Sequence, residues 1–464
     1  MTSYKDIIAK KREITAKALG FAYEKHEQGG LAFDYESMMN NTGYTLDEIR
    51  RIQLETGVGN TPLLELRQIT RLARKYAPPG KGARIFLKDE AANPSGSFKA
   101  RRAAISVYHA AKLGYAGVVA ATSGNYGAAV ASQAAMRGLR AIIVQEVYDS
   151  KGLGQPEILE KGRACEAYGA EVVQLTVGPE LFAIFLQVLD TTSYFNASLY
   201  TPYGIAGIET LGVEIVAEVR ARTGRDPDAV VITHAGGGNV TGTARGLKKA
   251  GAEACCVIGA SVDLGGLHMA SDSDFNRKSF TTGHTGFSVP FTTWPDRADV
   301  PRNAARSLRY LDRFGTVTQG EVFYATEMLA QLEGLERGPA GNVSLAAAFA
   351  LAQTMDEDQV IVVQETEYTG AGKHPSAQLA FAESQGIALS SGDPRGSVPG
   401  KSIIIPSHPN LLQFKELSMD ALRQSYLRNA LAHKGAGLLS PREVEFLSED
   451  SRTPQSLVWQ VVGK

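Results

Sequence analysis

The stretch Asn93-Pro94-Ser95-Gly96-Ser97-Phe98-Lys99 places one lysine directly after a turn and at the start of a helix. Its Ser and Gly residues allow the backbone to turn tightly, and the run Ala100-Arg101-Arg102-Ala103-Ala104 that follows has a helical composition. A lysine at a helix start usually faces solvent. It becomes a nucleophile at neutral pH only when its amine is partly deprotonated and held against an electrophilic carbon, so the role of Lys99 depends on the motifs that follow it.

The composition of the chain is that of an ordinary globular protein. Its 464 residues suffice for two or three domains, and 44 % of them are hydrophobic and 21 % charged. The net charge of −1 gives no global field for nucleic acid or a membrane surface. No apolar run is long enough to cross a bilayer and no signal-peptide core begins the chain, so a cytoplasmic protein is expected. Three cysteines without a Cys-x-x-Cys or Cys/His cluster predict neither a disulfide framework nor a metal site.

Short apolar runs alternate with helical stretches along most of the chain. Such strands, buried on both faces and separated by helices such as 127–137 and 344–355, predict parallel α/β sheets. Segment 261–315 is irregular and rich in small polar residues, which is typical of a binding loop or lid. The expected strands are 83–90, 117–121, 141–145, 171–175, 229–233, 255–260 and 359–363.

Three further loops follow expected strands and carry polar or glycine-rich sequence. Thr122-Ser123-Gly124-Asn125-Tyr126-Gly127 places backbone N–H groups at a helix N-terminus, which suits a carboxylate or an oxyanion. His234-Ala235-Gly236-Gly237-Gly238-Asn239 contains three consecutive glycines, whose bare backbone can surround a phosphate. The last is Glu365-Thr366-Glu367-Tyr368-Thr369-Gly370-Ala371-Gly372. Each loop alone is also compatible with an ordinary turn.

Together with the Lys99 turn, these loops predict a ligand site at the carboxyl ends of parallel strands, where open α/β sheets bind ligands. The site would contain a lysine that can form an imine, a loop for a phosphate and polar groups for a ring. This combination fits pyridoxal phosphate, an aldehyde with one phosphate, better than a nucleotide, because the glycine loop has neither the dinucleotide nor the Walker spacing.

The segment Ser95 to Lys99 resembles the cofactor-lysine motif of fold-type II pyridoxal-phosphate enzymes, the group of threonine synthase, threonine dehydratase and cysteine synthase. The resemblance spans roughly residues 55–375, and Ser123-Gly124-Asn125 is similar to the Ser-Gly-Asn motif of these enzymes. It implies that Lys99 is catalytic and binds the cofactor covalently, and that Ser123 and Gly124 contact substrate. The cofactor contacts that it implies are Asn125 at the ring hydroxyl and Ala235, Gly236, Gly237, Gly238 and Asn239 at the phosphate.

One departure from the family pattern concerns the partner of the pyridine nitrogen. In the family this is a Ser or Thr after the final strand, and here Thr366 and Thr369 both fit. We favour Thr369 because Gly-Ala-Gly follows it.

Within that group, the chain resembles the family of 2-amino-4-oxopentanoate thiolase β subunits, enzymes of ornithine degradation, up to about residue 430. The stretches 82–94, 283–287 and 365–374 carry this narrower resemblance. It implies that coenzyme A cleaves 2-amino-4-oxopentanoate to acetyl-CoA and alanine, in the D form. It also implies a small α subunit as partner and a homodimeric core within a hetero-oligomer. His284, in a Gly-His-Thr-Gly setting, is the candidate for a contact with substrate or CoA.

The resemblance also implies a tryptophan synthase β-like fold, with two parallel-sheet domains and the cofactor in the cleft between them. The expected divisions are a helical extension at 1–55, a large cofactor-binding domain at 56–92 and 215–410, a small domain at 93–214 and a tail at 411–464.

Two other functions remain open at this point. One is a β-elimination or β-replacement lyase of the threonine synthase or dehydratase kind, and the other is a catalytically silent regulatory subunit. An intact Lys99 and a complete phosphate loop argue against the silent subunit. Cys255 and Cys256 fall in an apolar strand, where structural thiols are usual, so we expect CoA to attack directly.

Overall fold

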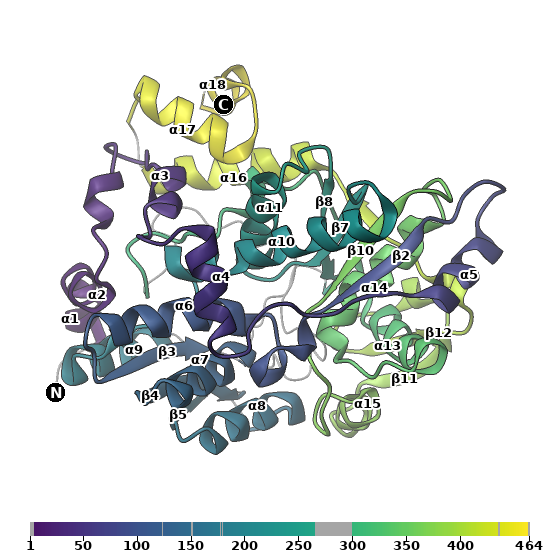
Figure 1. Cartoon of the computed structure of the whole chain (residues 1–464), viewed down its shortest axis with the longest axis horizontal. Coiled ribbons are helices and arrows are strands. Elements are labelled where there is room, and N and C mark those ends of the chain that lie inside the picture. The colour runs from purple at the N-terminus through teal and green to yellow at the C-terminus, as the bar shows by residue number, and fades with distance from the viewer. Residues whose placement is uncertain are drawn as a thin grey trace.

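The computed structural model describes residues 4–122, 124–149, 152–176, 178, 180–264, 299–434 and 437–462. Within these ranges the chain forms one large and one small β-sheet, each flanked by helices, and helical layers from both ends of the chain (Figure 1). The predicted α/β class is confirmed.

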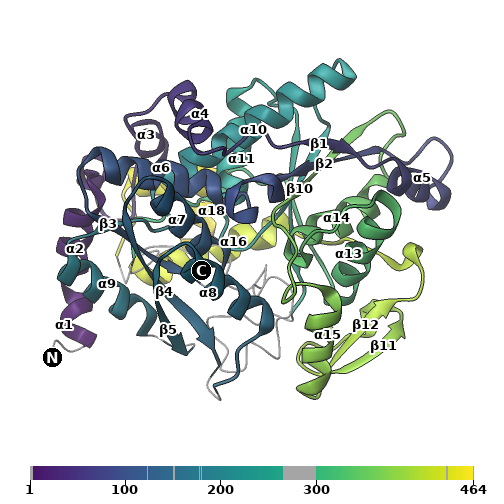
Figure 2. The same cartoon turned by 60° about the horizontal axis from the view of Figure 1, so that its bottom comes forward.

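The small sheet has the strand order β5-β4-β3-β6, and all of its strand pairs are parallel. Every residue of β3 is buried, which fits its sequence Gly-Val-Val-Ala-Ala-Thr. Helices α7, α8 and α9 connect successive strands of this sheet, which Figure 2 shows beside α6. The bounds are β3 Gly117–Thr122, β4 Arg140–Tyr148, β5 Glu171–Thr176, β6 Phe195–Asn196, α6 Lys99–Lys112, α7 Asn125–Met136, α8 Pro156–Ala167 and α9 Glu180–Thr192.

The large sheet has the order β1-β2-β10-β7-β8-β9-β13. Its inner pairs are parallel, whereas β1 and β13 pair with their neighbours in antiparallel fashion. The bounds are β1 Leu63–Glu65, β2 Arg84–Asp89, β7 Ala229–Thr233, β8 Cys256–Val262, β9 Arg313–Val317, β10 Val360–Glu365 and β13 Lys415–Leu417.

Helices cover both faces of the large sheet, because successive residues of its central strands point to opposite sides. In β10, Val360 and Val362 belong to one hydrophobic cluster, and Ile361 and Val363 belong to another. All residues of β7 and β10 are buried, as expected for parallel strands between helical layers. The helices are α5 Arg67–Tyr76, α10 Pro202–Thr223, α11 Gly238–Lys249, α13 Gln319–Glu333 and α14 Pro339–Ala352.

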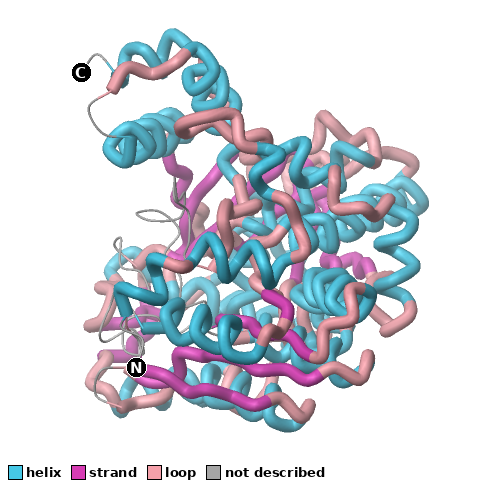
Figure 3. Tube along the Cα trace, turned by 90° about the vertical axis from the view of Figure 1, so that its left-hand side faces the viewer, coloured by secondary structure: helices cyan, strands magenta, loops and turns pink. Residues whose placement is uncertain are grey.

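The remaining elements lie at the periphery. Strands β11 (Ala388–Gly392) and β12 (Ser402–Pro406) form a separate parallel pair next to α15 (Pro375–Ser384). The C-terminal helices form a layer that Figure 3 shows standing away from the N-terminus. The terminal helices are α1 Tyr4–Ala9, α2 Lys11–Leu19, α3 Tyr35–Asn40, α4 Leu46–Leu54, α16 Met419–Lys434, α17 Pro441–Ser451 and α18 Gln455–Val462.

The two ends of the chain are joined by specific contacts. The backbone N–H of Leu31 donates a 3.1 Å hydrogen bond to the carboxylate of Glu443 in α17. Thr45 caps α4 through a capping box with Glu48. No helix in the described part of the chain combines the length and the apolar composition that crossing a membrane requires.

All seven expected strands are present with small differences at their ends, but parts of the prediction are wrong. The segment 261–315 was expected to be irregular, yet β8 continues to Val262 and β9 begins at Arg313, because β9 completes its hydrogen bonds between β8 and β13. Residues 265–298 of that segment lie outside the described residues. The large sheet is also not wholly parallel, because its edge strands β1 and β13 are antiparallel to their neighbours, whereas the small sheet is parallel throughout. The domain boundaries stay a prediction.

Candidate active site

The turn before Lys99 is built as the sequence predicts. Ser95 and Gly96 have positive φ angles of 64° and 68°, and α6 begins at Lys99. A Cβ atom on Gly96 would lie 2.2 Å from the ring of Tyr368, so only glycine fits. The amide of Tyr368 donates to the carbonyl of Gly96 at 2.7 Å, and that of Phe98 to the carbonyl of Thr366 at 3.1 Å. These bonds hold Lys99 against the loop that follows β10.

The amine of Lys99 lies in a cationic and partly buried place. Its Nζ atom is 4.7 Å from the centre of the Phe98 ring. Burial, and next the nearby cations Lys161, Arg102 and Lys373, lower the pKa of Lys99 to about 7, although Glu367 opposes the shift. A large part of the amine is therefore unprotonated at neutral pH, as a nucleophilic lysine requires.

Capture of an aldehyde by the cofactor-free protein is expected to accelerate as the pH rises and to level off above about 7, because only the neutral amine attacks. The rate can be followed by the absorbance change after mixing with pyridoxal phosphate at a series of pH values. The K99A variant supplies the background rate from surface lysines. A rate that keeps rising toward the ordinary lysine pKa of 10.5 would show that Lys99 is not perturbed.

Asn125 begins α7 directly after the loop that follows β3. It is buried, and its side-chain N–H₂ group donates to Oε2 of Glu367. The Nζ atom of Lys373 donates to Oδ1 of Asn125 and to Oε2 of Glu367, both at 2.9 Å. The structure thus brings Asn125 and the loop after β10 together. A Cβ atom on Gly124 would lie 3.1 Å from Nζ of Lys161, so this loop is also next to a cation.

Two of the predicted substrate residues, Ser123 and His284, lie outside the described residues. Their predicted roles therefore stay predictions.

The glycine loop Ala235–Asn239 joins β7 to α11, as predicted. A Cβ atom on Gly236 would lie 1.8 Å from the hydroxyl oxygen of Tyr200. One on Gly238 would lie 1.8 Å from Nη2 of Arg102, which is one helical turn after Lys99. The bare backbone is therefore needed here, and it faces a hydroxyl and a guanidinium group. Backbone amides at a helix N-terminus beside a guanidinium suit a phosphate.

The last residue of this loop is tied to the central strand of the large sheet. The side-chain N–H₂ group of Asn239 donates to Oε1 of Gln364 in β10. Through Arg102 and Gln364, the glycine loop lies beside both the Lys99 helix and the strand that leads to Thr369.

Buried polar atoms in these segments lack partners in a way that fits a bound ligand. Within the described parts of these segments, the side-chain oxygens without a hydrogen-bond partner include Ser95 Oγ, Ser97 Oγ, Asn239 Oδ1, Glu367 Oε1 and Thr369 Oγ1. Such groups are rare in native proteins and usually meet a ligand or water. The hydroxyl of Thr369 is one of these atoms, so Thr369 stays our predicted partner for the pyridine nitrogen. The donor set fits pyridoxal phosphate.

Four charged residues of this site have no role predicted from the sequence, namely Arg102, Lys161, Glu367 and Lys373. Burial alone would raise the pKa of Glu367, but Lys373 and Lys161 lower it to about 2, so it is a carboxylate. Burial lowers the pKa of Arg102 to about 10, which leaves it a cation at neutral pH. The sequence offers one signal for two of them, because Glu367 and Lys373 lie six residues apart directly after the buried strand β10.

The three cysteine thiols are not activated as nucleophiles. Burial raises the pKa of the Cys165 thiol to about 12 and that of Cys256 to about 11, and it raises that of Cys255 as well. A thiol that stays protonated is a poor nucleophile.

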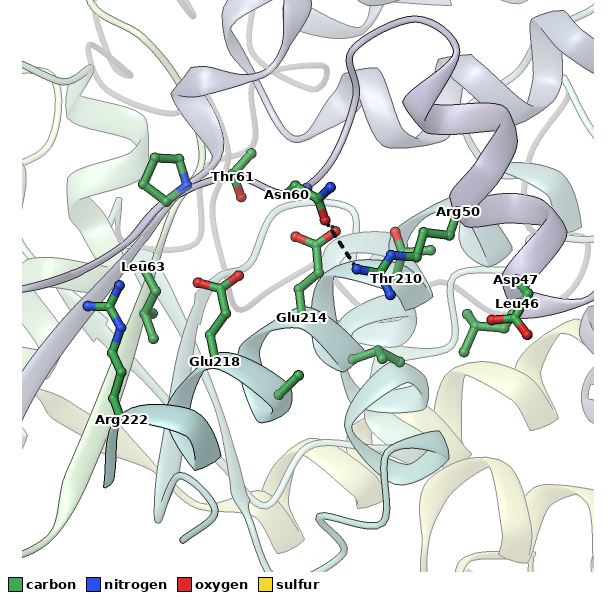
Figure 4. A pocket seen from close by; sticks show the side chains of 13 residues that line it. Leu46, Asp47, Arg50, Asn60, Thr61, Leu63, Thr210, Glu214, Glu218 and Arg222 are labelled. Atoms are coloured by element: carbon green, nitrogen blue, oxygen red, sulfur yellow. Dashed lines mark hydrogen bonds between the residues drawn. The ribbon is translucent and has the colours of Figure 1, made fainter. Parts of the chain in front are cut away.

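A separate pocket of about 330 Å³ lies between α4, the segment before β1 and α10. Figure 4 shows Glu214 and Glu218 extending from α10 toward Asn60 and Thr61. None of the predicted site residues lines this pocket, so it is not the Lys99 site. Two of its lining residues, Thr210 and Glu214, accept hydrogen bonds from Arg101, the centre of a buried network of ions.

Arg101 is fully buried and binds two carboxylates at once. Its Nε and Nη2 atoms donate to Glu90 at 2.7 and 2.8 Å, and its Nη1 and Nη2 atoms donate to Glu214 at 2.9 and 2.7 Å. Lys88, also fully buried, binds Glu214 at 3.0 Å and Glu218 at 2.6 Å. Because Arg101 is two residues from Lys99, this network fixes the start of α6 against β2 and α10.

Comparisons with known proteins support pyridoxal phosphate as the cofactor. Residues 54–367 match the family model described as pyridoxal-phosphate dependent enzyme. A relative from Acetoanaerobium sticklandii, named 2-amino-4-ketopentanoate thiolase beta subunit, is 64 % identical over 98 % of this chain and 97 % of its own. Another of that name, from an unknown prokaryotic organism, is 63 % identical over 99 % of this chain and 98 % of its own.

A solved structure of O-ureido-L-serine synthase superposes with a TM-score of 0.52 at 21 % identity, covering 68 % of this chain and 91 % of that chain. At this identity the similarity concerns the fold alone, and it confirms the predicted fold-type II architecture. The family model matches more than half of the chain, and the two relatives span nearly all of it. The chain therefore belongs to the pyridoxal-phosphate dependent enzymes, in the group of the 2-amino-4-ketopentanoate thiolase beta subunits.

Proposed function

We propose that this chain is the cofactor-bearing subunit of a thiolase that cleaves 2-amino-4-oxopentanoate, also named 2-amino-4-ketopentanoate, with coenzyme A. The C3–C4 bond breaks, the CoA sulfur bonds to C4, and the thiol proton ends on C3. The products are acetyl-CoA and alanine, which we propose is the D form. The identity of 63–64 % over nearly the whole chain with the two thiolase beta subunits carries this proposal.

The residues around Lys99 can hold pyridoxal phosphate in a defined orientation. The loop Ala235–Asn239 and Arg102 would hold the phosphate, Asn125 the ring hydroxyl, and Thr369 the ring nitrogen. When bound, pyridoxal phosphate supplies an electron-withdrawing ring that spreads the negative charge developing on an amino-acid carbon. Fixing the phosphate and the ring at separate points orients the substrate carbon toward Lys99.

Lys99 is the residue that moves the proton at the substrate's Cα. Its amine, with a pKa of about 7, can accept a proton and return it at neutral pH, as an efficient acid–base group should. The N-terminus of α7 at Gly124 and Asn125 provides the positive potential that a substrate carboxylate needs. Lys161, beside Gly124, is already paired with Glu157.

A partner subunit completes the proposed enzyme. Both relatives are named as beta subunits, so we propose a small α subunit as the partner of this chain, with a homodimer of this chain at the centre of the assembly.

The decisive assay combines the purified chain, loaded with pyridoxal phosphate, with 2-amino-4-oxopentanoate and CoA, in the presence and absence of a small α subunit. We expect acetyl-CoA and alanine in equal amounts when both subunits are present, and chiral chromatography assigns the alanine. Release of ammonia without consumption of CoA would instead identify a lyase of the threonine dehydratase kind.

A further inference from the structure

The loop after β10 places an ion pair directly on the side chain that is to hold the cofactor's ring hydroxyl. Glu367 accepts hydrogen bonds from the amide of Asn125 and from Lys373, and Lys373 also donates to the amide oxygen of Asn125. At most 1 % of Glu367 and Lys373 and 5 % of Asn125 is exposed. The three side chains form a closed triangle in which each contacts the other two.

This triangle allows one orientation of the Asn125 amide. If the amide were flipped, its N–H₂ group would face the ammonium of Lys373 and its oxygen would face the carboxylate of Glu367. A donor would then face a donor, and an acceptor would face an acceptor. In a buried site such unmade hydrogen bonds are costly. The observed orientation uses one N–H of Asn125 on Glu367, so the amide retains a second N–H for another acceptor.

The triangle also fixes where charge lies. Glu367 is a carboxylate, because Lys373 and then Lys161 and Lys99 lower its pKa against the effect of burial. The Glu367 charge lies on the N–H₂ side of Asn125 and the Lys373 charge on its oxygen side. An acceptor held by the free N–H of Asn125 is therefore next to a negative charge.

We propose that Glu367 and Lys373 are positioning residues that lock Asn125 and hold the proton of the cofactor's ring hydroxyl on its oxygen. This inference rests on the proposed cofactor site at Lys99. In bound pyridoxal phosphate, the ring oxygen shares a proton with the neighbouring nitrogen, and the two arrangements absorb at different wavelengths. A carboxylate beside the oxygen favours the arrangement with the proton on oxygen, which absorbs at the shorter wavelength.

The test compares the two absorbance bands of the cofactor-loaded protein at neutral pH. In E367Q, the short-wavelength fraction is expected to fall about threefold to tenfold relative to the long-wavelength one, since one nearby charge shifts a proton equilibrium by about one unit. In K373M it is expected to rise, because the carboxylate keeps its charge through Lys161 and loses its main counter-ion. A merely structural role would change both variants in the same direction.

Two variants serve as controls. K373R keeps the cation and is expected to match the unaltered protein. E365Q is the same substitution two residues earlier, at a buried acid whose pKa burial raises well above its ordinary value, so it removes no charge and should leave the bands unchanged. Equal band ratios in E367Q, K373M and the unaltered protein overturn the proposal. Should E367Q not fold, K373M alone decides, because no rise or a fall overturns it.

Failure of the underlying site gives a different result. If the unaltered protein shows neither band, the cofactor site at Lys99 itself is wrong. If it shows both bands and the variants do not move them, the site stands and the role of the ion pair does not.

Discussion

Replacing Lys99 with alanine is expected to abolish covalent binding of pyridoxal phosphate and to reduce thiolysis on the order of a thousandfold, the range in which positioned acid–base groups act. Lys99 is the amine that holds the aldehyde and the base that moves the Cα proton, so both functions disappear together. The visible absorbance of the purified protein reports the first, and acetyl-CoA formation with the α subunit present reports the second.

The matched control for this variant is K112A, at the other end of the same helix. Lys112 lies over the ring of Tyr44 at 4.9 Å, away from the loops that surround Lys99. K112A should therefore retain absorbance and turnover. If K99A retained the absorbance band, another lysine, with Lys161 and Lys373 the nearest candidates, would have to be the covalent partner.

The largest effect on stability is expected from R101M. The change leaves the buried carboxylates of Glu90 and Glu214 without the cation that both of them bind, which typically costs about 3–5 kcal/mol. Urea unfolding followed by circular dichroism measures the loss. Because Arg101 also anchors α6, the variant should retain pyridoxal phosphate less tightly than the unaltered protein.

The pH dependence of this loss identifies its cause. Burial would raise the pKa of Glu214, but Arg101 lowers it to about 2. A carboxyl group whose pKa is lowered by folding stabilises the folded protein at pH values above its pKa in the unfolded chain, about 4.5. This stabilisation is lost as the pH falls toward 2. The difference between R101M and the unaltered protein should therefore shrink as the pH is lowered below about 4.5. A difference that is independent of pH would indicate lost packing rather than unpaired charge.

The exposed pair between Arg220 and Asp226 provides the comparison. Arg220 is 46 % exposed, and salt bridges at the surface contribute little to the free energy of unfolding. R220M should therefore unfold at nearly the same urea concentration as the unaltered protein.

The sequence predicts the central part of the fold well, because its signal is local. Runs such as Val230-Val231-Ile232 are strands wherever parallel sheets lie between helices, and the structure confirms them. Strand β9, which lies between β8 and the edge strand β13, could not be predicted in the same way. Arg313–Val317 becomes β9 through its pairing with β8 and with Lys415–Leu417, about a hundred residues later, and no local pattern reveals such a partner.

The site was predictable where glycines and turns define it, and less so where charges meet across the fold. The turn at Ser95 and Gly96, the loop Ala235–Asn239 and the helix start at Asn125 all follow from local sequence. The contacts of Asn125 with Lys373, 248 residues further along the chain, depend on the packing of two sheets. From the sequence alone, Lys373 is a lysine in a turn, and its partners Asn125 and Glu367 are known only from the folded structure.

The order of strands in the large sheet has a consequence for synthesis on the ribosome. β10 lies between β2 and β7, although it follows both by more than a hundred residues. Until residue 365 of the 464 has emerged, β2 and β7 have no strand between them, and the Thr366–Thr369 segment is not yet available to pack against Lys99. A growing chain is therefore expected to expose two unpaired apolar strand edges for most of its translation. It can take up pyridoxal phosphate at the complete site only near the end, which makes chaperone supply a practical variable in producing this enzyme.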